Sequence, residues 1–166
     1  MIRVDIETII MAAGPVPSVI VLRERSSAET TSAPLRALSI QTGSYEAAAI
    51  SQGINGKCTG RPITHDLALE CIDKLGARVE RVEINRVEGT VFYADVVLSR
   101  DGEAEAAVDA RPSDAIALAV RVNAPVYVED DVMNRAGTVS YQTKENGEAE
   151  QAQFDAFVQN LSPDDF

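Results

Sequence analysis

The stretch DARPSDAIALAVRVNAPVYV, residues 109–128, holds three elements with almost no sequence between them. A turn at residues 111–114 is predicted to lead into a buried helix over 115–122. Residues 123–125 end that helix, because proline cannot continue it, and 126–128 is a short apolar strand. The polar residues gather at the helix start, where backbone N–H groups lack partners. They therefore suit a helix cap and a site for chemistry equally.

The composition is that of a soluble globular protein. The 166 residues are most simply one domain, with 45% hydrophobic and 25% charged residues. No apolar run approaches the roughly 20 residues of a membrane span, and charges interrupt the apolar N-terminus, which excludes a secretory signal. The expected compartment is the cytoplasm, without membrane contact.

The charge balance argues against a strongly basic surface for nucleic acid. The net charge is −11, but the six acids after residue 144 are accompanied by no Lys or Arg, which leaves 20 acids against 15 bases in residues 1–144. Twelve of the 15 bases are arginine, the residue that binds phosphate with two hydrogen bonds. A local basic groove is therefore compatible with the composition.

Alternating apolar residues predict strands on both sides of the opening stretch, in the order of an antiparallel meander followed by hairpins. The predicted strands are 2–7, 19–23, 35–40, 78–87, 90–98, 104–109 and 138–141, and two further helices are predicted at 45–54 and 64–75. A polar linker at 144–150 and an amphipathic helix around 154–161 follow. We predict one domain over residues 1–142 and an acidic linker with a C-terminal helix or tail over 143–166.

The helix at 64–75 has the clearest apolar stripe of the chain. Leu67, Cys71 and Leu75 recur every four residues, and Thr64 is a suitable N-cap. Cys71 is therefore predicted to lie in the core. Cys58 and Cys71 have neither metal-ligand spacing nor a histidine neighbour, which argues against zinc binding and thiol chemistry.

Three motifs resemble the bifunctional nuclease domain family, in the same order and with similar spacing. They are RPITHDL at 61–67, GTVFYA at 89–94 and RPSDAI at 111–116, and the resemblance covers roughly residues 1–130. It implies an α+β fold with a mixed, largely antiparallel curved sheet and helices packed on it, and a homo-oligomer, with a dimer favoured. It also implies nuclease activity on RNA and DNA, as described for plant relatives. Ser39 and Gln41 depart from the family pattern, which has proline and tryptophan there.

The function that the resemblance implies is hydrolysis of phosphodiester bonds, which usually needs carboxylates that hold Mg²⁺ or Mn²⁺, a proton-transfer group and a cation on the phosphate. His65, the only histidine, is the candidate general acid or base. The remaining candidates divide into metal ligands and substrate contacts. Asp66, Asp114 and Glu46 are the predicted metal ligands, and Arg61, Arg111 and Ser113 are the predicted substrate contacts.

A structural interpretation of the same residues leads to a different function. Asp66 lies where a negative charge favours the helix dipole, and Ser113 or Asp114 could cap the helix that follows. The protein would then be a non-catalytic, oligomeric binding or regulatory module in which the RPSD and THD motifs are structural. Capping requires neither metal nor phosphate, whereas the nuclease hypothesis requires His65, Asp66, Arg111 and Asp114 to cluster around a divalent ion.

Overall fold

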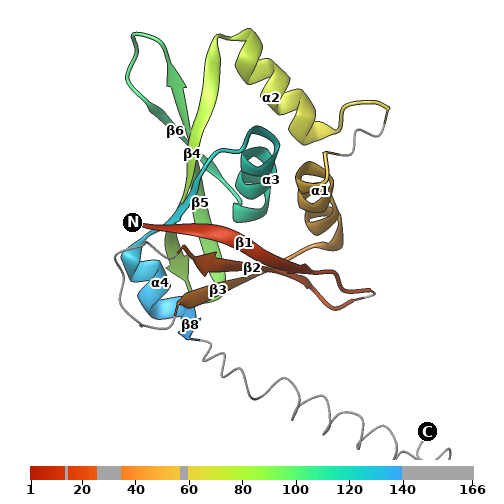
Figure 1. Ribbon diagram of the computed structural model, residues 1–166, viewed down its shortest axis with the longest axis vertical. Coiled ribbons are helices and arrows are strands. Elements are labelled where there is room, and N and C mark those ends of the chain that lie inside the picture. The colour runs from red at the N-terminus through yellow and green to blue at the C-terminus, as the bar shows by residue number, and fades with distance from the viewer. Residues whose placement is uncertain (14, 26–34, 57–59, 140–166) are drawn as a thin grey trace, which may run out of the picture.

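The computed structural model describes residues 1–13, 15–25, 35–56 and 60–139 (Figure 1). These residues form strands and helices in the order β1 (Ile2–Ile10), β2 (Ser18–Glu24), β3 (Arg36–Thr42), α1 (Ser44–Ile54), α2 (Thr64–Lys74), β4 (Ala77–Glu88), β5 (Val91–Arg100), β6 (Ala106–Ala110), α3 (Pro112–Val122), β7 (Val126–Val128), α4 (Asp130–Ala136) and β8 (Gly137–Val139). No helix in these ranges is long and apolar enough to cross a membrane.

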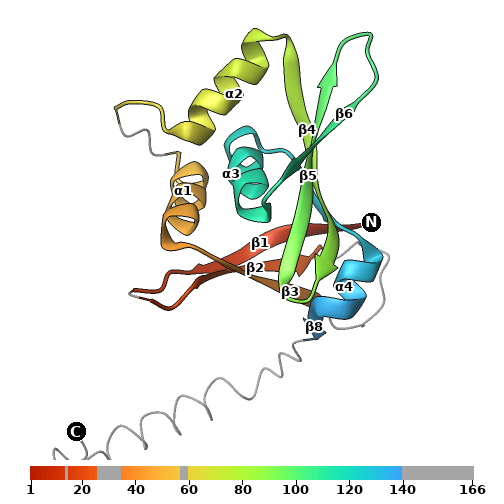
Figure 2. The same cartoon turned by 180° about the vertical axis from the view of Figure 1, so that it is seen from behind.

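All eight strands belong to one open sheet with the order β6-β5-β4-β7-β1-β2-β3-β8. Every pair of neighbours is antiparallel except β4 and β7, which are parallel. Figures 1 and 2 show that β4–β6 and β1–β3 run in crossing directions, with α1, α2 and α3 grouped together beside them and α4 at another side. The predicted α+β class with a mixed, largely antiparallel sheet is confirmed.

The hairpin of β4 and β5 is the longest strand pairing of the sheet. Apolar and polar residues alternate along β4, as expected for a strand with one buried side. Val82, Ile84 and Val87 are buried on one side of β4, while polar residues face the other side. Gly89 makes the turn with a φ of 60°, which glycine adopts without strain. The hairpin contributes Ala94 and Val96 of β5 to the same core.

Helices α1 and α3 lie side by side and supply small residues where they meet. Ala47 and Ala49 of α1 and Ala115 and Ala119 of α3 are buried. At the far end of the contact, a Cβ on Gly53 would lie 2.6 Å from Val120 Cγ2. Small residues let the two helices approach closely, which fixes their starts next to each other.

The opening stretch folds as a strand, a helix and a strand, with one shift of boundary. Helix α3 begins at Pro112 rather than at residue 115, since proline fits the first helical position, where its missing N–H is not needed. It ends at Asn123, whose φ of 55° makes a left-handed C-cap. The predicted strand β7 is confirmed at Val126–Val128.

One core assignment is wrong. Cys71 is exposed, as are Leu67 and Leu75, which are 56% and 70% accessible. No residue of α2 is fully buried. Its half-buried apolar residues are Ala68, Leu69 and Ile72, so these residues form the side of the helix that faces the rest of the fold. The predicted C-terminal linker and helix at 143–166 lie outside the described residues.

Candidate functional site

Three helices begin close to one another and bring the motif residues together. Glu46, Asp66 and Asp114 each lie in the first turn of their helix, in α1, α2 and α3 respectively. The N-cap residues Gly43, Ile63 and Arg111 all have extended backbones, and none of the three caps its helix through a side chain. Residues from three distant parts of the sequence therefore meet at one end of the α1–α3 pair.

Arg111 is the centre of this group of ion pairs. Its Nε and Nη2 donate to the two carboxylate oxygens of Asp114, at 2.7 and 3.2 Å, and its Nη1 donates to Glu46 Oε1 at 3.1 Å. His65 Nε2 lies 3.2 Å from Asp114 Oδ1. We call Glu46, His65, Arg111 and Asp114 the helix-start cluster. Arg111 is 65% exposed, so its guanidinium reaches solvent while the two carboxylates orient it.

The cluster shows that Asp114 and Ser113 do not cap α3. The N-cap is Arg111, whose backbone oxygen accepts from the N–H of Asp114 and of Ala115. Ser113 is buried and is 7% accessible, and its role as a substrate contact stays a prediction. The capping hypothesis is therefore wrong for α3, and the Asp114 carboxylate is free for Arg111 and His65.

Asp66 belongs to a second, adjoining group of contacts. Its Oδ2 accepts from the backbone N–H of Ile63 at 3.0 Å, so Asp66 does satisfy a group at the start of α2. Thr64 is the first helical residue and not the cap. The other oxygen, Oδ1, accepts from Nε of Arg121 at 2.7 Å.

Arg121 is the residue that the sequence reasoning missed. Its side chain is only 9% exposed and also donates from Nη1 to the backbone oxygens of Ala49, at 3.0 Å, and Ala117, at 2.8 Å. We call this set of bonds the Arg121 clasp, because it ties α1, α2 and α3 together. A Cβ on Gly53 would lie 2.7 Å from Nη1, so the glycine leaves room for it. The available signal was a single arginine within the apolar segment AIALAVRV.

The ion pairs hold both aspartates in the charged form. The hydrogen bond from Arg121, helped by that from Ile63, lowers the pKa of Asp66 below its ordinary 3.8. Burial of Asp114 acts to raise its pKa, but hydrogen bonds from Arg111 and His65 outweigh this and the pKa is lowered. The same bond to Asp114 raises the pKa of Arg111.

The two ring nitrogens of His65 differ in their contacts. Nδ1 is buried and makes no hydrogen bond with any described residue, whereas Nε2 faces Asp114. A neutral His65 that carries its proton on Nε2 would donate to Asp114 and leave a lone pair on Nδ1. This is the arrangement in which a carboxylate fixes the tautomer of a proton-accepting imidazole.

The carboxylates do not fit a divalent ion in their present pairing. Asp66 is engaged by Arg121, while Arg111 lies between Asp114 and Glu46. Within the described ranges, no three His, Cys, Asp or Glu side chains are placed to hold a metal. Arg61 is exposed and forms no ion pair with a described residue. Metal dependence and the substrate role of Arg61 both stay predictions.

Comparison with known proteins gives matches that agree with the three motifs. A profile of the bifunctional nuclease domain matches residues 20–140. An uncharacterized protein of Mycobacterium tuberculosis is 39% identical over 137 residues, which cover 79% of this chain and 81% of the relative. Bifunctional nuclease 1 of Arabidopsis thaliana is 37% identical over 70 residues, and bifunctional nuclease 2 of Oryza sativa is 37% identical over the same length. Both plant matches cover 41% of this chain and 22% of the plant protein.

Proposed function

The chain belongs to the bifunctional nuclease domain family, and we propose that it is a nuclease that hydrolyses phosphodiester bonds of RNA, DNA or both. The observation that carries the proposal is the helix-start cluster, in which an exposed arginine, a carboxylate and the only histidine meet. The names of the plant relatives support the same activity for proteins that share 70 aligned residues with this chain.

In this proposal Arg111 binds the phosphate. Its guanidinium is exposed and contacts first-turn residues of α1 and α3, and a negatively charged group is favoured near the start of a helix. The phosphate would take over donors that now serve Glu46 and Asp114, since a planar guanidinium can bind a phosphate oxygen pair in the same way as a carboxylate.

His65 transfers the proton. Asp114 orients the ring through Nε2, and Nδ1 provides the lone pair for a proton from the attacking water or, once charged, returns one to the leaving oxygen. Because Nδ1 is buried, its engagement requires the first turn of α2 to open toward the substrate. No step of this scheme is assigned to a metal ion, because the carboxylates that would hold it are paired with arginines.

The test is cleavage of labelled single-stranded and double-stranded RNA and DNA by the purified protein, with Mg²⁺, with Mn²⁺ and with EDTA. We expect cleavage that His65→Asn and Arg111→Gln each reduce by about a hundredfold or more. Arg86→Gln, a change at an exposed arginine on β4, is the matched control and is expected to cleave like the wild type. Equal cleavage by all four proteins would contradict the roles proposed for His65 and Arg111.

A second function has an observation of its own. Every charged group of the helix-start cluster already has a partner, and the Arg121 clasp has the form of a structural ion pair. These features favour a non-catalytic binding or regulatory module. Asp114→Asn separates the two: a lowered melting temperature without any cleavage by the wild type supports the module. In both cases we propose a homodimer, which sedimentation equilibrium measures.

A further inference from the structure

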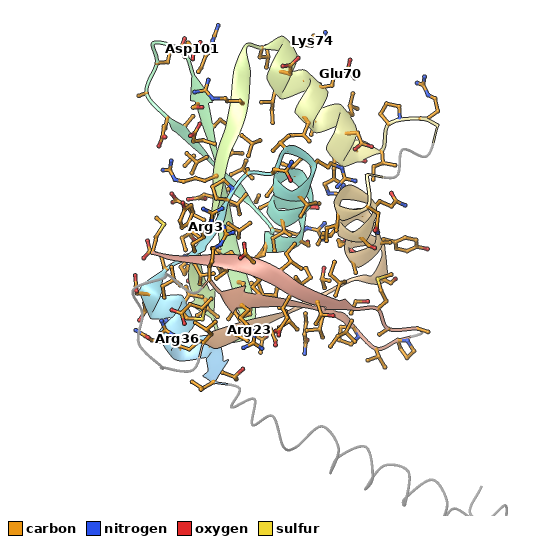
Figure 3. All side chains as sticks on the ribbon, in the orientation of Figure 1. Arg3, Arg23, Arg36, Glu70, Lys74 and Asp101 are labelled. Carbon is orange, nitrogen blue, oxygen red and sulfur yellow. The ribbon has the colours of Figure 1, made fainter. Side chains whose placement is uncertain are left out.

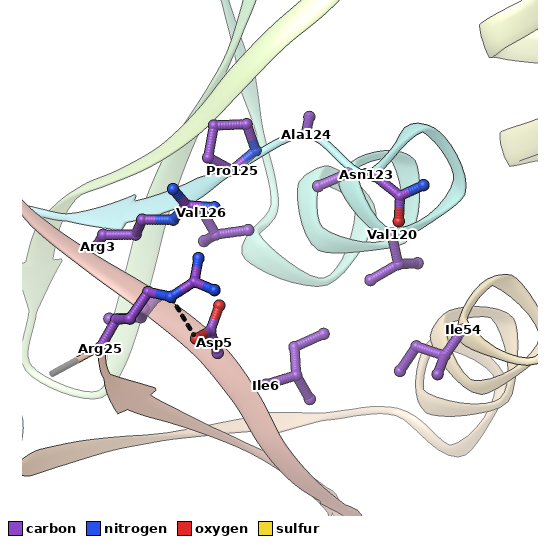
Figure 4. Close-up of a pocket in the computed structure, with 12 residues that line it drawn as sticks. Arg3, Asp5, Ile6, Arg25, Ile54, Val120, Asn123, Ala124, Pro125 and Val126 are labelled. Atoms are coloured by element: carbon purple, nitrogen blue, oxygen red, sulfur yellow. Dashed lines mark ion pairs between the residues drawn. The ribbon is translucent and has the colours of Figure 1, made fainter.

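A cavity lies at the opposite end of the α1–α3 pair from the helix-start cluster. Its volume is about 440 Å³, within the range of small-molecule sites, which is about 300–1,000 Å³. It is formed by the end of α1, the last turn of α3, the connection to β7 and strand β1 (Figure 4). None of the residues of the proposed nuclease site lines it.

The walls of the cavity differ in character. Ile6, Ile54 and Val120 form an apolar side, and the side chains of Arg3 and Arg25 stand on the other side, as Figure 4 shows. Arg25 Nε pairs with Asp5 at 3.3 Å, and that carboxylate also lines the cavity. The ionic wall therefore carries two positive charges and one negative charge.

Arg3 is unusual among the arginines of this chain. Ten of the twelve form ion pairs with a described Asp or Glu: Arg23, Arg25, Arg36, Arg78, Arg81, Arg86, Arg100, Arg111, Arg121 and Arg135. Arg3 has no such partner among the described residues, although acids outnumber bases in the chain. Figure 3 shows it near the start of β1, apart from the paired Arg23 and Arg36. Within the described part of the chain, no carboxylate competes for its guanidinium, which can therefore pair with an added anion.

We propose that this cavity is a binding site for a small organic anion, a molecule with an apolar body and one phosphate or carboxylate group. The anionic group pairs with the guanidinium of Arg3, while Asp5 keeps Arg25 in place beside it. The apolar body covers Ile6, Ile54 and Val120, which removes apolar surface from water. The proposal is independent of nuclease activity, since the two sites share no residue.

The experiment measures binding of three probes by calorimetry, with the isoleucine methyl signals of Ile6 and Ile54 followed by NMR. Phenyl phosphate and benzoate carry both parts of the proposed ligand, and inorganic phosphate lacks the apolar body. We expect the tighter of the two aromatic anions to bind at least about tenfold more tightly than inorganic phosphate and to shift both methyl signals. Which aromatic anion binds more tightly identifies the anionic group.

Two variants and one control separate the walls of the cavity. Arg3→Gln is expected to weaken binding of the aromatic anion by about tenfold or more. Ile54→Ala is expected to weaken it by about three- to tenfold and to leave binding of inorganic phosphate unchanged. Arg100→Gln removes the same charge from an exposed arginine at the end of β5, which does not line the cavity, and is expected to leave binding unchanged. Absence of binding at about 10 mM probe overturns the proposal. So does an unchanged affinity in Arg3→Gln, or an equal loss in Arg100→Gln.

Discussion

The two ends of the α1–α3 pair use charge in opposite ways. Where the helices begin, Arg111 is shared by Glu46 and Asp114, and every charge has a partner of opposite sign. Where the helices end, Arg3 stands at a cavity without a described partner. Paired charges hold elements in place, whereas an unpaired charge beside an apolar surface adds little stability and can attract a ligand. The comparison therefore separates charges that hold the helix starts together, whatever else they bind, from a charge at the helix ends that is available for binding alone.

The largest expected loss of stability is at the Arg121 clasp, which holds α1, α2 and α3 together next to the helix-start cluster. Arg121→Met keeps most of the apolar stem but removes three hydrogen bonds and leaves Asp66 without its cation. We expect the free energy of unfolding to fall by about 3 kcal/mol, measured by urea denaturation. Arg135→Met, at an exposed arginine that pairs with Asp131 at 3.4 Å, is the control and should change it by less than about 0.5 kcal/mol.

Gly53→Ala tests the same clasp from α1. Alanine favours a helix by about 1 kcal/mol over glycine, yet its Cβ would collide with Val120 and with the guanidinium of Arg121. A net destabilisation therefore indicates that the close contact matters more than helix propensity. A loss below about 1 kcal/mol in Arg121→Met, together with a stabilised Gly53→Ala, would contradict a structural role for the clasp.

A smaller loss of stability is expected from substitution of Asp66 or Asp114, and this loss depends on pH. Because the pKa of Asp66 and of Asp114 is lowered by folding, the stability that each contributes is complete above about pH 4 and is lost as the pH falls through the folded pKa. We expect Asp66→Asn and Asp114→Asn to cost about 1 kcal/mol each at pH 7, since both carboxylates are partly exposed. The difference from the wild type should shrink below pH 4. A difference that stays constant from pH 7 to pH 3 would show that the ionised carboxylates are not responsible.

The smallest effect is expected at the other end of the helices. Arg3→Gln should change the free energy of unfolding by no more than about 0.5 kcal/mol without ligand, because the side chain is exposed and has no described ion pair to lose. Thermal unfolding of the wild type and the variant measures this. A loss as large as that of Arg121→Met would remove the distinction between the two ends and assign Arg3 a structural role.

Local elements could be predicted because their signals lie within a few residues of one another. The hairpin of β4 and β5 follows from alternating Val82 and Ile84 and from a glycine turn, and α3 follows from RPSD and the stop at Asn123. The face of α2 was predicted wrongly for the same reason. Its periodicity shows two apolar stripes, one with Cys71 and one with Ile72, and only packing against the rest of the fold decides which stripe is covered.

The candidate site was predicted in part. The sequence pointed to Glu46, His65, Arg111 and Asp114, and the fold does bring these four together. It did not point to Arg121. Nor did it indicate that Asp66 pairs with Arg121, whereas Glu46 and Asp114 pair with Arg111. The side-chain contacts of the site, His65–Asp114, Arg121–Asp66 and Arg111–Glu46, join residues 49, 55 and 65 positions apart. No local pattern indicates which charge will meet which over such separations.

The sequence by itself determined the order of the elements, the family, and which residue types stand at the three helix starts. Side-chain periodicity and turn residues act over a few positions, so helices, strands and turns can be predicted from them without a structure. Only the tertiary structure decided that the three starts converge, that arginines neutralise the carboxylates there, and that Arg3 is left beside a cavity. These outcomes depend on how α1 and α3 pack, because close contact through Ala47, Gly53 and Ala119 sets the distances between charges that are remote in sequence.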